Sequence, residues 1–191
     1  MSGTLNAMVL HDLQPIKGWW DEHSLDKSAD LALTAGQVGY AGMVVSMNIA
    51  RTFDLGLECG GVAIFLRQNS YDFDVVGDAG NLVGSGNGGV GAPAPRVSGL
   101  VALGSFEVQS TEFDIADING YPPNTPLTAG AVHTASAGVI RPGVAYTDTI
   151  CGVVSDGVVT NEHGIQVLQF WTAWLPPFAP CAPESSNSLG I

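Results

Sequence analysis

Apolar and polar positions alternate in the C-terminal part of the chain in the manner of β-strands. The clearest run, residues 167–175, is followed directly by Pro176-Pro177. Because successive strand residues point to opposite faces, the run divides into two sets. One face carries Leu168, Phe170 and Trp174, and the other carries Val167, Trp171, Ala173 and Leu175. Both faces are mostly apolar, so this strand is either buried inside a two-layer β-fold or keeps one face for a partner.

The same short-period pattern recurs along most of the chain and predicts further strands separated by Gly, Asn and Pro turns. Residues 161–164, Asn-Glu-His-Gly, stand between two apolar runs as a hairpin turn does. The expected strands cover residues 42–53, 62–67, 97–103, 106–113, 127–132, 137–140 and 165–175. Short strands at close intervals favour an all-β fold, a compact β-sandwich or β-barrel with extended N-terminal and C-terminal arms.

Composition divides the chain into three parts. Residues 1–35 form an N-terminal arm, residues 36–177 the β-domain, and residues 178–191 a Pro-rich C-terminal tail. A Gly-rich loop at residues 77–96 lies within the β-domain. Its length exceeds that of an ordinary connection, which marks it as functional or mobile.

The N-terminal arm contains one candidate helix. Ser24 is a suitable N-cap, and Asp26 follows it in what would be the first turn. The pattern therefore predicts a short helix over residues 25–33. The alternative is an arm without regular structure that tethers the protein to a neighbour.

Charge excludes several classes of partner. The chain of 191 residues has 18 acidic and 6 basic residues, for a formal charge of −12. The basic residues are scattered singly along the sequence, whereas phosphate binding needs them clustered. We therefore expect neither nucleic acid nor an anionic membrane as a partner. No apolar run has the length of a membrane span, and no signal peptide is visible at the N-terminus.

The cysteines indicate a reducing environment. Cys59, Cys151 and Cys181 are widely spaced and odd in number. Such a set is typical of free thiols in a protein made in a cytoplasm, so no disulfide is expected.

Motifs that carry chemistry are weak. Residues 84–89 match the spacing G-x-G-x-x-G, but the prolines that follow prevent the helix that a dinucleotide site needs. Asp72, Asp74 and Asp78 could hold a surface ion, yet no Glu closes an EF-hand loop. The four histidines are far apart, and no G-x-S-x-G nucleophile motif is present. We expect no enzyme, no cofactor and no bound metal.

Large aromatic side chains are the most informative candidates that remain. Tryptophan is enriched at the energetic centres of protein interfaces, and Pro-rich arms gain contacts when they lie over a neighbour. The alternative is that the same residues form an ordinary core. The candidate partner-contact residues are Trp19, Trp20, Phe170, Trp171, Trp174, Phe178 and Leu189.

Two stretches carry a family resemblance. Residues 147–176 read T-D-T-I-C-G-V-V-S-D-G-V-V-T-N-E-H-G-I-Q-V-L-Q-F-W-T-A-W-L-P, and residues 67–75 read R-Q-N-S-Y-D-F-D-V. The first resembles the end of a family of tailed-bacteriophage virion proteins, in which Y-x-D-x-(I/V)-x-G-V-V-S-x-G leads to G-x-x-V-L-x-F-W-x-x-W-L-P. The resemblance covers roughly residues 62–76 and 98–177. It rests on packing residues rather than catalytic ones.

That family consists of capsid decoration, or head cement, proteins. The resemblance implies a β-rich virion protein on the outer capsid surface, made in the host cytoplasm, with the major capsid protein as its partner and a homotrimer as its assembly. A strongly acidic protein suits the outside of a shell filled with DNA. Another virion component, such as a tail or head-fibre protein, is the first alternative. A carbohydrate-binding or hydrolytic β-domain is the second.

Overall fold

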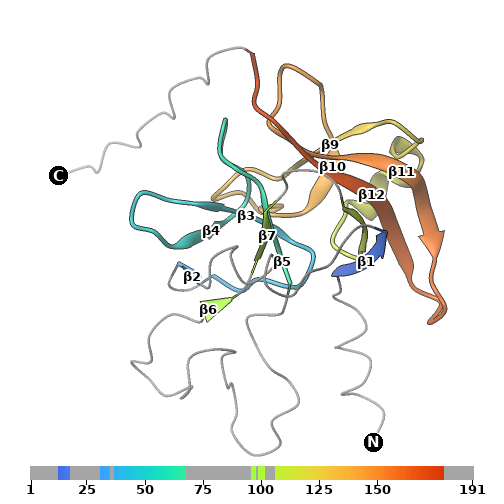
Figure 1. Ribbon diagram of the computed structural model, residues 1–191, viewed down its shortest axis with the longest axis horizontal. Coiled ribbons are helices and arrows are strands. Elements are labelled where there is room, and N and C mark those ends of the chain that lie inside the picture. The colour runs from blue at the N-terminus through green and yellow to red at the C-terminus, as the bar shows by residue number, and fades with distance from the viewer. Residues whose placement is uncertain are drawn as a thin grey trace, which may run out of the picture.

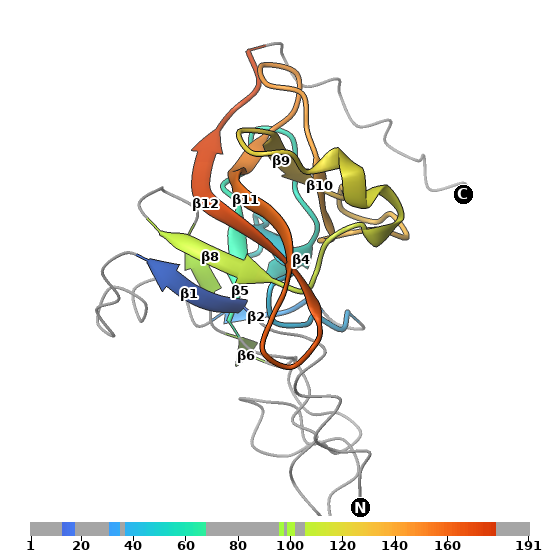
Figure 2. The ribbon, with the colours of Figure 1, turned by 90° about the vertical axis from the view of Figure 1, so that its right-hand side faces the viewer.

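The described part of the protein is built almost wholly of antiparallel β-strands (Figure 1). The structure is a computed structural model that describes residues 13–17, 31–34, 37–67, 96–97, 99–101 and 106–178. Its larger sheet has six strands, which appear side by side in Figure 2. In spatial order they are β1 (Leu13–Lys17), β8 (Glu107–Ser110), β12 (Gln166–Leu175), β11 (Ile150–Thr160), β9 (Pro126–Ala129) and β10 (Ile140–Pro142).

A smaller sheet packs against the first. Its strands, in spatial order, are β4 (Phe53–Leu55), β3 (Val44–Met47), β5 (Ile64–Leu66) and β7 (Gly99–Val101). A separate two-stranded ladder joins β2 (Leu31–Ala32) to β6 (Arg96–Val97). The helical structure of the described residues is one short 3₁₀ segment, η1 (Ile115–Gly120), which the Asp114 side chain caps.

The core lies between the two sheets, as the predicted β-sandwich requires. The Phe65 and Phe170 rings, one from each sheet, are 5.3 Å apart, and both side chains are fully buried. The opposite face of the smaller sheet is also buried, against Leu33 and its neighbours. Burial on both faces explains why β5 reads as a continuous Ile-Phe-Leu run rather than an alternating one. The all-β fold is confirmed.

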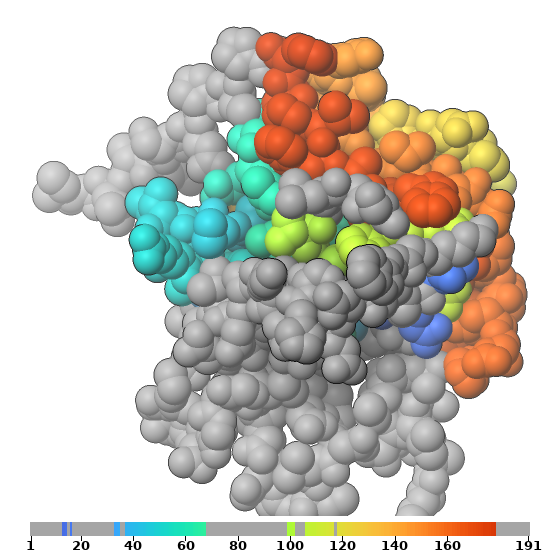
Figure 3. Space-filling view, viewed as in Figure 1, coloured from blue at the N-terminus to red at the C-terminus, as the bar shows by residue number. Residues whose placement is uncertain are grey.

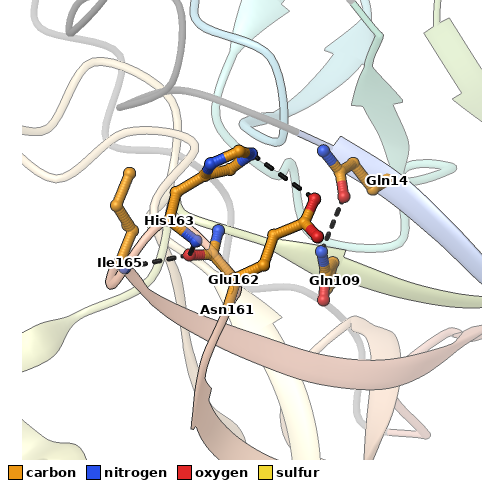
Figure 4. A network of polar contacts seen from close by, with 6 residues as sticks. All are labelled: Gln14, Gln109, Asn161, Glu162, His163 and Ile165. Atoms are coloured by element: carbon orange, nitrogen blue, oxygen red, sulfur yellow. Dashed lines mark hydrogen bonds and ion pairs between the residues drawn. The ribbon is translucent and has the colours of Figure 1, made fainter.

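The β11–β12 hairpin is the longest element of the sheet and confirms the turn predicted at residues 161–164. Asn161 closes this turn: its Oδ1 atom accepts hydrogen bonds from the backbone N–H groups of His163 at 3.0 Å and Ile165 at 2.9 Å (Figure 4). Two irregularities interrupt the pairing, between Ile150 and Gly152 and between Val154 and Gly157. These bulges bend the hairpin so that it wraps the core.

Several predictions about elements need correction, among them the expected strand over residues 137–140, of which only Ile140 lies in β10. The expected strand over residues 42–53 is a hairpin, β3 and β4, because Asn48 and Arg51 turn the chain. The expected helix over residues 25–33 is wrong at its end, since residues 31–33 pair as extended backbone with β6 and Phe53; residues 25–30 lie outside the described residues. β1 belongs to the predicted N-terminal arm, yet it pairs with β8 as the edge of the larger sheet.

Candidate functional site

An aromatic pair stands on the surface where the end of β12 meets the loop of residues 143–149. Figure 3 shows these two segments side by side at the top of the molecule, in red and orange. The Tyr146 and Phe178 rings are 4.9 Å apart and tilted by 38°, and they are 66% and 78% exposed. The Phe178 N–H donates to the Tyr146 carbonyl at 3.0 Å. We call this pair of exposed rings the aromatic patch.

The loop beneath the patch is tightly closed by hydrogen bonds. The Asp148 carboxylate accepts from the Val144 N–H at 2.8 Å, and the Asp148 N–H donates to the Val144 carbonyl at 2.9 Å. Tyr146 takes a φ of +71° within this turn. A left-handed backbone costs a residue with a side chain roughly 1–2 kcal/mol, and it is unusual for a bulky one. Strained residues of this kind concentrate at functional sites.

Buried hydroxyl groups fix the loop to β9 and to the connection between β4 and β5. The Thr149 Oγ1 atom accepts from the Gly60 N–H at 2.7 Å and donates to the Glu58 carbonyl at 3.3 Å. The Thr128 hydroxyl donates to the Thr149 carbonyl at 2.9 Å. The aromatic patch therefore rests on a braced support rather than on a free loop.

A cavity with polar and apolar lining lies beside this support. It has a volume of about 200 Å³, and its wall includes the side chains of Glu58, Arg141, Thr147 and Asp148. No histidine contributes to the wall, and the Asp148 carboxylate already accepts the Val144 N–H.

Phe170 is buried in the core, and Trp174 is partly buried against it. Phe170 is fully buried between the sheets, so its prediction as a partner-contact residue is wrong for the isolated chain. Trp174 packs on the same core and its indole Nε1–H donates to the Gly61 carbonyl at 2.9 Å. Both residues lie on the inner face of β12, whereas contact with a partner requires side chains on the outer face.

Trp171 points to the outer face of the larger sheet and is 39% exposed. Two residues away on the same face, Gln169 begins a row of amides across three strands. The Gln169 Nε2 donates to the Gln109 Oε1 at 3.4 Å, and the Gln109 Nε2 donates to the Gln14 Oε1 at 2.7 Å. Figure 4 shows the second of these bonds, between β8 and β1. Trp171 is therefore available for contact, within a mainly polar surround.

The remaining predicted contact residues, Trp19, Trp20 and Leu189, lie outside the described residues. Phe178 is placed on the surface, as a contact residue must be, and its partner Tyr146 was missed. The signal that could have found Tyr146 is the Pro-Gly turn before it, which predicts an exposed loop. Contact between the two side chains is not visible in the sequence, because they belong to separate elements.

Cysteine chemistry differs from the expectation. Cys59 is disulfide-bonded, so the prediction that all thiols are reduced is wrong. Cys151 is a free thiol in the core, where burial raises its pKa to about 12. Cys181 lies outside the described residues.

The structure reveals no metal cluster within its described ranges: no three His, Cys, Asp or Glu side chains come close enough to hold an ion. The residues proposed for a surface ion, Asp72, Asp74 and Asp78, and the Gly-rich loop lie outside those ranges. Among the residues described, no helix is long and apolar enough to cross a membrane. No family model, curated protein or solved structure matches the chain.

Proposed function

We propose that this protein is a viral structural protein that binds the outside of a phage capsid and stabilises it by bridging major capsid protein subunits. The observation that carries the proposal is the aromatic patch, whose two exposed rings sit on a strained but braced loop. Exposed aromatic side chains on a rigid support are the usual energetic centres of a protein interface. The family resemblance of residues 147–176 supplies the identity of the partner.

The proposed mechanism is burial of apolar surface repeated over a symmetric shell. Fully burying a side chain of the size of Phe178 contributes roughly 1.5–3 kcal/mol. One such contact is weak, but a protein that holds two capsid subunits gains from the high effective concentration of the second site. The formal charge of −12 favours the outer surface over the DNA-filled interior.

The first test is a heat challenge of purified shells with and without the full chain. Shells that carry the protein should release their contents at a higher temperature, by several degrees, as measured by the fluorescence of a DNA-binding dye. The Phe178→Asp variant should bind shells about tenfold or more weakly, since it places a charge in the buried contact. Val62→Asp, at an exposed valine outside the patch, is the matched control and should bind normally.

A second variant separates binding from folding. Tyr146→Gly relieves the left-handed backbone, so its thermal stability should equal or exceed that of the wild type, while its shell binding falls. Equal resistance of shells with and without the protein would sink the proposal. So would unchanged binding of both patch variants. A particle map that located the protein on the tail would support the alternative of a tail component.

A further inference from the structure

The β3–β4 hairpin ends in a second exposed apolar feature, outside the aromatic patch. Its tip, residues 47–51, carries Ile49 fully exposed, Met47 more than half exposed, and Arg51 beside them. In Figure 1 this hairpin projects at the left of the molecule, in cyan. A fully exposed isoleucine contributes nothing to the core of its own chain, so its apolar surface is free for contact with a partner.

The tip is rigid, as a contact element should be. The Asn48 Oδ1 atom accepts from the backbone N–H groups of Ala50 at 3.0 Å and Thr52 at 3.1 Å. Its Nδ2 atom donates to the Thr52 hydroxyl at 2.7 Å and to the buried Asp54 carboxylate at 2.9 Å. Such preorganisation lowers the entropy lost when the tip is bound.

An open groove lies at the other end of the molecule, between η1 and the β11–β12 turn. It has a volume of about 590 Å³, and its wall combines the apolar residues Phe113, Ile115 and Ile165 with the polar residues Thr111, Thr160 and Gln166. Ile115 is 60% exposed at the start of η1. The turn on the far side of the groove is held by Asn161, as Figure 4 shows. Figures 1 and 3 place this turn at the right of the molecule, opposite the β3–β4 hairpin.

Charge favours the pairing of tip and groove. Two acidic residues adjoin the groove-lining segments: Asp114, exposed between Phe113 and Ile115, and Glu162, 86% exposed in the turn. The tip carries Arg51, one of only 6 basic residues in a chain with a formal charge of −12. Two copies of so acidic a chain repel each other unless their contact brings opposite charges together.

We propose that copies of this chain associate head to tail, with the β3–β4 tip of one copy seated in the groove of the next. Ile49 would contact the Ile115 and Ile165 side chains, and Arg51 would lie near Asp114 and Glu162. The contact is heterologous, so it forms a closed ring if the rotation between copies permits and an open chain otherwise. This surface is distinct from the aromatic patch, so the inference does not depend on binding to shells.

The test is complementation between two variants, in the absence of any capsid. Ile49→Asp places a charge at the tip, and Ile115→Asp places a charge in the groove. Both isoleucines are exposed, so neither substitution should destabilise the fold. Each variant alone should be monomeric by sedimentation velocity at concentrations where the wild type is oligomeric, with association weakened about tenfold or more. Mixed in equal amounts, the two variants should form a dimer and nothing larger. The intact tip of Ile115→Asp can bind the intact groove of Ile49→Asp, and no other intact tip or groove then remains.

Val62→Asp is the matched control and should remain oligomeric like the wild type, with all three variants checked by circular dichroism. A wild type that stays monomeric at every concentration overturns the inference. It is equally overturned if Ile49→Asp still forms oligomers, or if the mixture of the two variants yields no dimer. Failure of these tests leaves shell binding by the aromatic patch untouched, so the two proposals can fail separately.

Discussion

Cys151 shows how one buried side chain links stability to pH. The thiol is fully buried and donates to the Leu127 carbonyl at 3.4 Å, and burial raises its pKa to about 12. In the unfolded chain the same thiol loses its proton at its ordinary pKa of about 8.5. The unfolded state is therefore stabilised by deprotonation first as pH rises, and the free energy of unfolding should fall by about 1 kcal/mol per pH unit above about pH 9.

Urea denaturation of the wild type and of Cys151→Ala at a series of alkaline pH values measures this effect. The alanine variant starts less stable, because it loses buried sulfur contacts, but its slope should be shallower. Tyrosine and lysine side chains titrate in both proteins, so the difference between the two curves isolates Cys151. Parallel curves would show that the thiol does not ionise differently in the two states.

At the scale of an element, the β11–β12 hairpin depends on one close approach of backbone to ring. A Cβ atom added at Gly152 would stand 2.8 Å from the Phe170 Cδ2 atom and 3.0 Å from the Trp171 carbonyl oxygen. Gly152→Ala should therefore lower the free energy of unfolding by about 1–3 kcal/mol, because the ring must shift in a packed core. Thermal unfolding followed by circular dichroism measures the loss.

A double-mutant cycle identifies the cause of that loss. In a Phe170→Leu background the ring is absent, so the cost of Gly152→Ala should shrink by about 1 kcal/mol or more. The same cost in both backgrounds would mean that the backbone of β11, and not the Phe170 ring, resists the substitution.

The two hairpins show which turns a sequence pattern can predict. The β11–β12 hairpin could be predicted, because its turn contains Asn and Gly between two strongly apolar runs. The β3–β4 turn could not, because it contains neither Gly nor Pro; the Asn48 side chain and the positive φ of Arg51 make it. Pairing of β1 with β8 depends on a contact between distant segments, which local periodicity does not report.

At the scale of the whole molecule, the two-sheet fold was predictable and the candidate surfaces only in part. Phe178 was predicted as a contact residue, since it follows the Pro176-Pro177 break, but its pairing with Tyr146 is a tertiary contact. Phe170 was misassigned because an apolar strand gives no sign of which face meets the core. The turn at Ile49 was not predicted, because the hydrophobic pattern of residues 42–53 is that of one continuous strand.

The disulfide at Cys59 affects the stability of the whole molecule. Cys59 lies in the loop whose Gly60 N–H donates to Thr149, next to the support of the aromatic patch. Disulfides persist in oxidising surroundings, including virion surfaces, and typically contribute about 2–4 kcal/mol to stability. Reducing agent should therefore lower the melting temperature of the wild type by several degrees and weaken its binding to shells. Cys59→Ser should show the lower melting temperature without reductant and no further change with it. An equal melting temperature for the wild type with and without reductant would contradict a structural role for this bond.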